Sequence, residues 1–456
     1  MNIIVPSTPH YQAACAVTRR LMEAGFETYF AGGAVRDAIM GNGASDWDIA
    51  TSATPEQMEA LFSHTIPVGK EFGVVIVLSH GFPFEVAAFR SDGQYIDGRR
   101  PRTITYTTPR EDVFRRDFTI NGLLMEPHTG EIIDFVGGVQ DITDGVVRAI
   151  GEPVARFTED HLRMLRAVRF CARFGFSMDE KTREAIHAMA PMVQSVSKER
   201  VRDELEKMLT GPNPARAISL LEETGLLAVI LPPVAALREV EQPPDFHPEG
   251  DVLTHTIKLF EVARKPMNAA LAFAALLHDV GKKEACQVRN GRLTFYYHEK
   301  IGAELAESIM RGLKCSGALV KDVAGLVLNH MKLARAEQIR VSTLKRLMAL
   351  ECAGDYGEAV TFFSMLLELN RMDSMASNWD CSDYLTARTR SEKIPKEEAK
   401  PKPFITGRDL IARNLKPGPR FKPLLDTCLD AQLEGLVADR EAALAHLDSL
   451  LADSPQ

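Results

Sequence analysis

The sequence predicts an α+β protein of several domains, in which a mixed β-sheet head is followed by domains built only from helices. The 456 residues exceed what one hydrophobic core usually supports, so two to four domains are expected. Strand-like and helix-like segments alternate over residues 1–147, and from Thr158 onward apolar residues recur at helical spacing. We therefore expect the head at 1–147, a helical neck at 148–235, a third helical domain at 236–385, and a linker with a small helical tail at 386–456.

Composition is typical of a globular protein, with 45% hydrophobic and 25% charged residues. No apolar run reaches the length of a membrane span, and the start lacks the plan of a signal peptide. The seven cysteines occur singly without a C-x-x-C pair, which favours reduced thiols over disulfides or a zinc ribbon. We expect a cytoplasmic protein without a membrane partner. The net charge of −8 argues only weakly against a nucleic-acid partner, because residues 148–183 carry eight Lys and Arg against five Asp and Glu.

Short local patterns predict the elements of the head. In chain order we expect a helix at 8–25, a strand at 27–33, a short helix at 34–41 closed by Gly41, a strand at 46–52, a helix at 54–62 with Thr54 as N-cap, two strands at 73–89 joined by Gly-Phe-Pro, and a further strand at 130–142.

The rest of the chain is expected to be helical. Residues 157–176 predict one helix that begins at a Thr158 cap, has acidic residues in its first turn and ends at Gly175. Its apolar residues share one face and its arginines the other. Further helices are expected up to about Ser377, and the charged, proline-bearing segment 389–403 predicts a linker or mobile loop.

A pair of carboxylates at Asp46 and Asp48 is the first candidate site. On a strand both side chains point to one face, where two like charges repel unless a cation lies between them. Carboxylate oxygens indicate Mg²⁺ before other metals. Glu85, on a strand expected to lie beside them, is the best-placed third carboxylate for a two-metal site of phosphoryl transfer.

A glycine pair at Gly32 and Gly33 precedes Arg36 at the start of the next predicted helix. Glycines let backbone N–H groups approach phosphate oxygens closely, and a helix start favours anions. The segment is not a P-loop, since no Gly-Lys-Ser/Thr follows. Together with the carboxylates it indicates a nucleoside triphosphate held by backbone amides and metal ions.

Four segments resemble, in order and in sequence, the signature of the nucleotidyltransferase superfamily in its tRNA nucleotidyltransferase and poly(A) polymerase branch. They are "YFAGGAVRDAIMGNGASDWDIATSATPEQ" at 29–57, "RRDFTINGLLMEP" at 115–127, "EDHLRMLRAVRFCARFGF" at 159–176 and "ERVRDELEKML" at 199–209. The resemblance covers roughly the first 235 residues. It implies addition or repair of the 3′-terminal CCA of tRNA from CTP and ATP, with release of pyrophosphate, Mg²⁺ as cofactor, tRNA as partner and no DNA.

The resemblance also implies roles for individual residues. It assigns base selection to Asp160 and Arg163, which at i and i+3 would be neighbours on one helix. A carboxylate accepts from the amino groups of cytosine and adenine, and a guanidinium donates to their ring acceptors. The other expected nucleotide-binding residues are Gly33, Arg36, Arg116, Asp117, Asn121, Arg166 and Arg169. A "DGRRP" loop at 97–101 favours terminal A addition, while enzymes that add only A or only CC remain alternatives.

The second half predicts a separate metal centre. "LLHDVGK" sets His278 beside Asp279, and His255 and Asp373 flank it in an order that resembles the HD phosphohydrolase superfamily. His298 and His330 could extend the site to a second ion. Such mixed ligands suit Mn²⁺, Ni²⁺, Fe or Mg²⁺. Alternatives are a hydrolase in which this site provides the main activity, or a domain kept as scaffold; the sequence does not indicate the oligomeric state.

Overall fold

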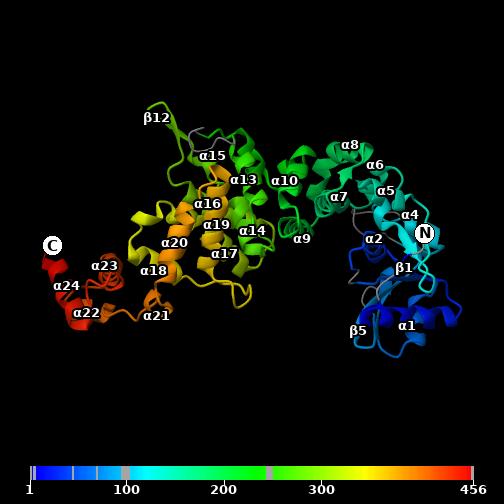
Figure 1. Ribbon diagram of the computed structural model, residues 1–456, viewed down its shortest axis with the longest axis horizontal. Coiled ribbons are helices and arrows are strands. Elements are labelled where there is room, and N and C mark those ends of the chain that lie inside the picture. Colours follow the sequence, from blue (N-terminus) through cyan, green and yellow to red (C-terminus); the bar gives the residue numbers. More distant parts are fainter. Residues whose placement is uncertain are drawn as a thin grey trace. The chain divides into compact units, whose positions relative to one another are not determined.

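The computed structural model describes residue 3 and residues 7–43, 46–67, 70–93, 103–242 and 250–452. The chain divides into two compact units, Met1–Pro232 and Pro233–Gln456 (Figure 1). A mixed sheet lies in the first unit and helices make up most of the described remainder, which confirms the predicted α+β class. The finer domain boundaries within each unit stay predictions.

The head is built on a seven-stranded sheet with the order β3-β4-β5-β2-β1-β8-β9. Its strands are β1 (Thr28–Ala31), β2 (Ile49–Thr51), β3 (Thr65–Ile66), β4 (Val74–Ser79), β5 (Phe82–Ala88), β8 (Leu123–Met125) and β9 (Ile132–Asp134). The strands β2 and β5 run parallel, and the other neighbouring pairs run antiparallel. A separate ribbon joins β6 (Arg90–Asp92) to β7 (Ile104–Tyr106).

Trp47 explains how the chain approaches β2. Its ring is 1% exposed and packs against Phe30 and Tyr11, with ring centroids 4.8 and 4.9 Å away. Because alternate side chains of extended backbone point to opposite faces, the buried Trp47 turns Asp46 and Asp48 away from this core. The strand itself begins at Ile49, so both aspartates lie just before it and not within it as predicted.

The hairpin of β4 and β5 turns at His80 and Gly81, not at the predicted Gly-Phe-Pro. Both residues have positive φ, 51° and 82°, as a tight two-residue hairpin turn requires. Phe82 and Pro83 therefore belong to β5 and pair with Ser79 and Leu78.

The strand predicted at 130–142 is also shorter. It ends at Asp134, whose carboxylate accepts hydrogen bonds from four successive backbone N–H groups, those of Val136, Gly137, Gly138 and Val139. These bonds turn the chain into helix α5 (Gly138–Asp144). A side chain that satisfies several N–H groups competes with sheet pairing, and here it ends the strand.

The other helices of the head are α1 (Pro9–Glu23), α2 (Gly33–Ile39), α3 (Pro55–Leu61) and α4 (Pro109–Phe114), with short 3₁₀ turns at Lys70–Phe72 and Thr119–Asn121. Thr54 caps α3 as predicted, and its hydroxyl accepts from the N–H of Gln57. The neck contains α6 (Pro153–Glu159), α7 (Leu162–Phe174), α8 (Glu180–Met189), α9 (Lys198–Leu209), α10 (Pro214–Glu223) and α11 (Leu226–Ile230), with β10 (Val146–Val147) beside β11 (Ser177–Met178) and a 3₁₀ turn at Ala190–Ser195.

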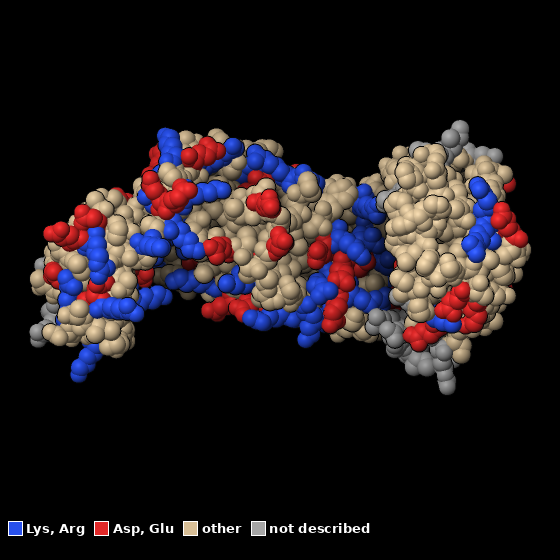
Figure 2. All heavy atoms as spheres, turned by 90° about the horizontal axis from the view of Figure 1, so that it is seen from below, with Lys and Arg blue, Asp and Glu red and all other residues tan. Residues whose placement is uncertain are grey.

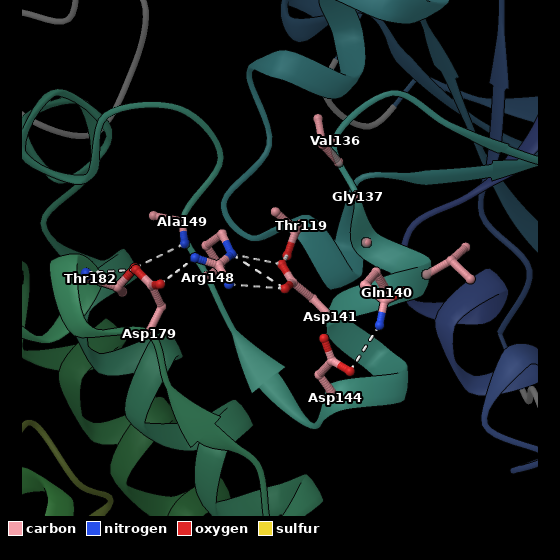
Figure 3. Close-up of polar contacts among 12 residues, drawn as sticks. Thr119, Val136, Gly137, Gln140, Asp141, Asp144, Arg148, Ala149, Asp179 and Thr182 are labelled. Atoms are coloured by element: carbon pink, nitrogen blue, oxygen red, sulfur yellow. Dashed lines mark hydrogen bonds and ion pairs between the residues drawn. The ribbon is translucent and has the colours of Figure 1, made fainter.

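A polar joint links head and neck (Figure 3). The guanidinium of Arg148 pairs with Asp141 on α5 and with Asp179, the N-cap of α8. One residue later, the N–H of Ala149 donates to the hydroxyl of Thr182, 3.1 Å away. These contacts join the two parts of the first unit that carry the candidate site.

In its described residues, 233–242 and 250–452, the second unit has helices and one hairpin, β12 (Gln287–Arg289) with β13 (Arg292–Thr294). Its central helices are α13 (Val252–Glu261), α14 (Ala269–Leu277), α15 (Lys282–Ala285), α16 (His298–Gly312), α17 (Gly317–Asn329), α18 (Val341–Met348), α19 (Phe362–Ser377) and α20 (Ser382–Glu392). Short turns of helix lie at Pro232–Ala235 (α12), Ala236–Glu239, His330–Leu333 and Ala336–Gln338.

The predicted linker at 389–403 is partly wrong. The first residues of this segment complete α20, and α21 (Lys396–Ala399) follows with Ala399 buried. The tail then consists of α22 (Gly407–Ile411), α23 (Phe421–Leu433) and α24 (Arg440–Ala452) around its own small core. Prolines and charges delimit α21 but do not prevent it from packing. In the described parts of the chain, no helix is both long and apolar enough to span a membrane.

Candidate functional site

A cleft of about 520 Å³ opens between head and neck within the first unit. All nine predicted nucleotide-binding residues line it, together with one of the predicted carboxylates, Asp48. Its lining includes eight arginines against three aspartates, an excess of positive charge that suits a polyphosphate. The structure therefore brings the residues that the sequence predicts to bind nucleotide into one cleft, and their role there stays a prediction.

Asp48, at the edge of this cleft, is influenced by two other carboxylates. Because Ile49 pairs with Val86 in the parallel register of β2 and β5, Asp48 lies next to Glu85. Burial and, after it, the charges of Asp46 and Glu85 together raise the pKa of Asp48 to about 6. The charge of Arg116 offsets this rise only in part, so the close carboxylates suit a divalent cation.

The glycine turn follows β1 beside Asp48, since the N–H of Ala31 donates to the carbonyl of Asp48 at 3.0 Å. Gly32 has φ +68° and is the N-cap of α2, so the chain adopts a conformation there that favours glycine. A Cβ on Gly32 would lie 3.0 Å from Nη1 of Arg116. The absence of a side chain thus lets a guanidinium come close to the backbone at a helix start, where phosphate oxygens are favoured.

Asp112 is a site residue that sequence reasoning missed. It is 1% exposed, and its two oxygens bind Arg115 at 2.7 Å and Arg116 at 2.9 Å. Burial alone raises its pKa, but the charges of Arg116 and Arg115 outweigh this and lower the pKa below its ordinary value. The acidic first turn of α4 was its only signal in the sequence, and surface helices commonly carry such residues.

A chain of polar contacts crosses the floor of the cleft. Arg36 donates to Asn121, whose amide donates to Asp117, 3.0 Å away. Asp117 in turn pairs with Arg166 of the neck, at 2.8 Å. Burial opposes ionisation of Asp117, yet Arg166 and the Asn121 hydrogen bond hold its pKa near 2. These residues orient one another in the structure and line the cleft at the same time.

The ring of Phe170 makes cation–π contacts with three arginines of the cleft. Arg169, Arg166 and Arg36 place their guanidinium carbons 4.3, 5.3 and 5.4 Å from its centroid. Stacking of this kind fixes planar guanidinium groups and leaves their N–H edges for hydrogen bonds.

The predicted helix at 157–176 is broken at the base-selecting position. Thr158 belongs to α6 and caps nothing, while Asp160 has extended backbone, with φ −147° and ψ 105°, between α6 and α7. Its side chain accepts from the N–H of Leu162, so it satisfies a free N–H at the start of α7. The prediction that Asp160 and Arg163 are neighbours on one helix is therefore wrong, although both line the same cleft.

Each member of this pair is held by other groups. Arg163 donates to the carbonyls of Arg156 and Arg115, each 3.0 Å away, and to Glu159. Asp160 pairs with Arg200 of α9, which lay within a matching sequence block but had no predicted role.

The predicted metal ligands of the second unit also converge. Two sets of three ligand atoms lie within 4.8 Å of one another, His255 with His278 and Asp279, and Asp279 with His298 and His330. Asp373 joins the first set, since its Oδ1 lies 3.0 Å from Nε2 of His255. Asp279 belongs to both sets and so stands between them.

Three of these histidines are oriented by backbone carbonyls. Nδ1 of His278, His298 and His330 lies 2.9, 2.8 and 2.6 Å from a carbonyl oxygen three residues earlier. A carbonyl only accepts, so Nδ1 carries the proton and Nε2 of each neutral ring presents a lone pair. Metal-binding histidines are commonly fixed in this manner.

Those lone pairs face other acceptors. Nε2 of His278 lies 3.1 Å from Oδ2 of Asp279. Nε2 of His298 lies 3.2 Å from Nε2 of His330. Two acceptor atoms this close repel each other unless a proton or a cation lies between them. The observed separations are those expected for ligands of one metal ion, because atoms bound at about 2.1 Å from a metal lie about 3 Å apart. The donor set therefore fits a metal ion.

Charges near the centre agree with this picture. Burial opposes ionisation of Asp279, but His278 and Lys282 hold its pKa below the ordinary value. Burial lowers the pKa of His330 to about 4, which keeps its Nε2 available as a ligand. Lys282, which sequence reasoning passed over, lies 2.7 Å from Asp279 and donates to Gln242. A cleft of about 530 Å³, lined by Asp279, His298 and Asp373, leads to the centre. The predicted "DGRRP" loop at 97–101 lies outside the described residues.

Comparison with known proteins finds matches to three family models. Residues 28–148 match the family model of the poly A polymerase head domain, 175–237 that of the RNA and SrmB-binding site of polymerase A, and 291–447 that of tRNA nucleotidyltransferase domain 2. The CCA-adding enzyme of Geobacillus thermodenitrificans is 48% identical over 219 residues, which are 48% of this chain and 54% of that protein. The CCA-adding enzyme of Geobacillus stearothermophilus is 45% identical over 223 residues, or 49% and 55%. The match thus spans about half the length of these curated relatives.

The fold extends the likeness beyond the matched half. The crystal structure of the Bacillus stearothermophilus CCA-adding enzyme in complex with CTP superimposes with a TM-score of 0.73, covers 98% of each chain and is 29% identical. The head and neck thus match domains of poly A polymerases and the tail half a tRNA nucleotidyltransferase domain, and the chain shares its fold with a CCA-adding enzyme.

Proposed function

We propose that this protein adds or repairs the 3′-terminal CCA of tRNA from CTP and ATP and releases pyrophosphate. The observation that carries the proposal is the cleft of the first unit. It brings a carboxylate of the head, an excess of arginines and the Asp160–Arg163 pair of the neck into one space. Carboxylates for a metal ion, cations for a triphosphate and polar groups for a base edge are the parts that nucleotide addition requires.

Each group then has a proposed task. Asp46 and Asp48, with Glu85 nearby, fit Mg²⁺, which when bound supplies charge neutralisation at the phosphate and activation of the attacking 3′-hydroxyl. Arg116 and Arg36 bind phosphate oxygens beside the glycine turn.

The base is read by the remaining cleft groups. Asp160 accepts from the amino group that cytosine and adenine share, and Arg163 donates to their ring acceptors. Asp117 and Asn121 order the wall between phosphate and base.

The partners follow from the same chemistry. The structural relative with 29% identity binds CTP, which supports a nucleoside triphosphate in this cleft. On the face shown in Figure 2, many Lys and Arg side chains lie among Asp and Glu over the helical part of the molecule, and these cations could contact an RNA backbone. The described cysteines are all free thiols, which suits a reducing compartment such as the cytoplasm.

Nucleotide addition to defined tRNA ends tests the proposal. Transcripts that end before CCA and transcripts that end in CC are incubated with CTP, ATP or both, with Asp48→Ala as the inactive variant. The control is Asp144→Ala on α5, where the carboxylate accepts from Gln140 at the surface. Full CCA addition by the parent and by the control, with none by Asp48→Ala, is expected. Addition of A alone or of CC alone would replace the proposal by the corresponding partial enzyme.

We propose a second activity, a metal-dependent phosphohydrolase in the second unit. The observation that favours it is the set of facing lone pairs on His278, His298, His330 and Asp279. The set fits one or two divalent ions such as Mn²⁺, Ni²⁺ or Mg²⁺, which when bound activate water against a phosphoester. His255 and Asp373 complete the first ion's ligands, and Asp279 contributes to both.

Replacing His278 and Asp279 together by Ala tests this activity. Elemental analysis is expected to show loss of metal, and hydrolysis of small phosphoesters and of 2′,3′-cyclic phosphate ends is expected to vanish, while CCA addition continues in the first unit. A parent protein without transition metal and without hydrolysis in Mg²⁺, Mn²⁺ or Ni²⁺ would make the second unit a scaffold.

A further inference from the structure

We propose that Arg200 determines nucleotide specificity by holding the carboxylate of Asp160 in a single orientation, an inference that rests on the proposed function of this cleft. Arg200 lies on α9, forty residues further along the chain. Its Nη1 donates to Oδ1 of Asp160 at 3.1 Å and its Nη2 to Oδ2 at 2.7 Å. A bidentate hydrogen bond of this kind fixes the plane of a carboxylate as well as its position.

Asp160 depends on such a clamp because its backbone does not orient it. It lies in extended conformation between α6 and α7, where no regular helix restricts the side chain. The N–H of Leu162, 3.1 Å from Oδ1, is its other described contact and touches one oxygen only. Without Arg200 the carboxylate could rotate about that single bond.

The clamp leaves a defined set of free groups. A carboxylate accepts about four hydrogen bonds. Leu162 and Arg200 together supply three, so one acceptor remains on Oδ2. Arg163 has about five N–H donors. It uses three of them on Arg156, Glu159 and Arg115, so two remain among its described contacts.

One acceptor beside two donors matches the pairing edge of cytosine, which presents an amino donor followed by two acceptors. Adenine shares the amino donor and the adjacent ring acceptor. Uracil presents a carbonyl in place of the amino group and an N–H in place of the ring acceptor, so it meets two mismatches. Selection therefore requires the free lone pair of Asp160 to point at the base, which is the property that Arg200 controls.

The two members of the pair are clamped independently. Arg163 is held by groups of α6 and of the head, and Arg200 is not among its described hydrogen-bond partners. Loss of Arg200 should therefore disturb the acceptor and leave the donors and the triphosphate-binding arginines in place. This separates a positioning role in base selection from a general role in nucleotide binding.

The test compares Arg200→Met with Arg200→Lys and with Arg202→Met, a matched control on α9 whose guanidinium pairs with Asp203 at the surface. Incorporation kinetics on a tRNA that lacks CCA give the ratio of kcat/KM for CTP to that for UTP. The ratio is expected to fall by about tenfold or more in Arg200→Met, the worth of a charged hydrogen bond. It should be partly restored in Arg200→Lys and unchanged in Arg202→Met.

A second comparison uses an Asp160→Ala background. There Arg200→Met should have no further effect on the CTP-to-UTP ratio, because Arg200 acts through Asp160. A variant that is less stable or slower with the ratio intact would show a merely structural role and overturn the inference. So would a further fall of the ratio in the Asp160→Ala background.

Calorimetric binding of CTP and UTP measures the same preference without turnover. One outcome is a parent protein that binds CTP in preference to UTP and yet adds no nucleotide, while Arg200→Met loses that preference. This result would overturn the proposed function but would support the role of Arg200 in base selection. Equal binding of CTP and UTP by the parent protein would overturn both.

Discussion

Replacing Asp48 with Asn is expected to stabilise the metal-free protein while it abolishes nucleotide addition. The physical reason is the raised pKa of the half-buried Asp48 carboxyl, which burial and the charges of Asp46 and Glu85 lift to about 6. The ionised Asp48 carboxylate, partly buried and close to two other negative charges, destabilises the folded chain. The neutral amide of Asn, which has the same shape, does not. The site that binds metal is thus expected to weaken the fold when no metal is bound.

The size of the effect follows from the pKa. The difference between the ordinary value of 3.8 and about 6 corresponds to about 3 kcal/mol. Partial exposure of the side chain reduces this to about 2 kcal/mol through solvent screening. For a unit of this size, about 2 kcal/mol raises the melting temperature by roughly 4–8 °C.

Asp117→Asn makes the same chemical change with the opposite sign. Arg166 and Asn121 overcome the effect of burial on Asp117 and lower its pKa from 3.8 to about 2, so its ionised form stabilises the folded chain by about 2 kcal/mol. This variant should therefore melt below the parent protein at neutral pH.

The two effects also differ in their pH dependence. The pKa of Asp48 is higher in the folded than in the unfolded chain, so the advantage of Asn is full above about pH 6 and disappears as the pH falls toward about 4. The stabilisation by Asp117 is full above about pH 4 and is lost as the pH falls through about 2.

Fluorescence of Trp47 reports unfolding of the first unit. The chain has two tryptophans, and Trp379, in the second unit and 73% exposed, is removed by Trp379→Phe. Melting is followed at pH 8 with a chelator and then with Mg²⁺, which should stabilise the parent background more than Asp48→Asn. The reasoning is refuted if Asp48→Asn melts below the parent in chelator, or if Mg²⁺ stabilises both equally.

Four further outcomes are expected. Arg163→Ala should lower the ratio of kcat/KM for CTP to that for UTP as well as the rate, because we propose that its free donors read the base edge; competition among all four triphosphates measures this, and an intact ratio would indicate a purely structural role. Asp112→Ala should raise the KM for CTP and lower stability by about 3 kcal/mol, since two arginines lose a buried carboxylate; denaturant unfolding and kinetics check the two effects. Arg148→Met should change stability by less than about 1 kcal/mol because the side chain is 46% exposed, yet lower kcat by loosening the joint of head and neck; equal kcat would contradict this. His330→Ala should reduce bound metal from two ions to one per chain by elemental analysis, whereas complete loss would indicate a single shared ion.

The sequence by itself determined the features that depend on neighbouring residues. Alternation around Trp47 predicts that Asp46 and Asp48 face one way, and the burial of Trp47 agrees with this although the strand starts at Ile49, three residues later than predicted. The cap at Thr54 likewise depends on contacts within one turn of helix. Helical spacing of apolar residues was enough to predict the helical second half.

Local reasoning failed where a side chain competed with the backbone. Asp160 satisfies a free N–H at the start of α7, and Asp134 gathers four N–H groups, so each ends an element that periodicity extends. Propensity and spacing do not indicate which of two such arrangements has the lower free energy. The tertiary structure decides it, because Arg200 stabilises the broken helix at Asp160 from another helix.

The partners of the charged residues were decided only by the tertiary structure. Spacing paired Asp160 with Arg163, three residues away, but the fold pairs Asp160 with Arg200, forty residues away, and Asp117 with Arg166, forty-nine residues away. An arginine reaches many carboxylates within its length, and the packing of head on neck selects one of them. The sequence therefore determined which chemical groups the site contains, and the packing of distant helices determined their orientation, because hydrogen-bond geometry depends on positions that no local pattern specifies.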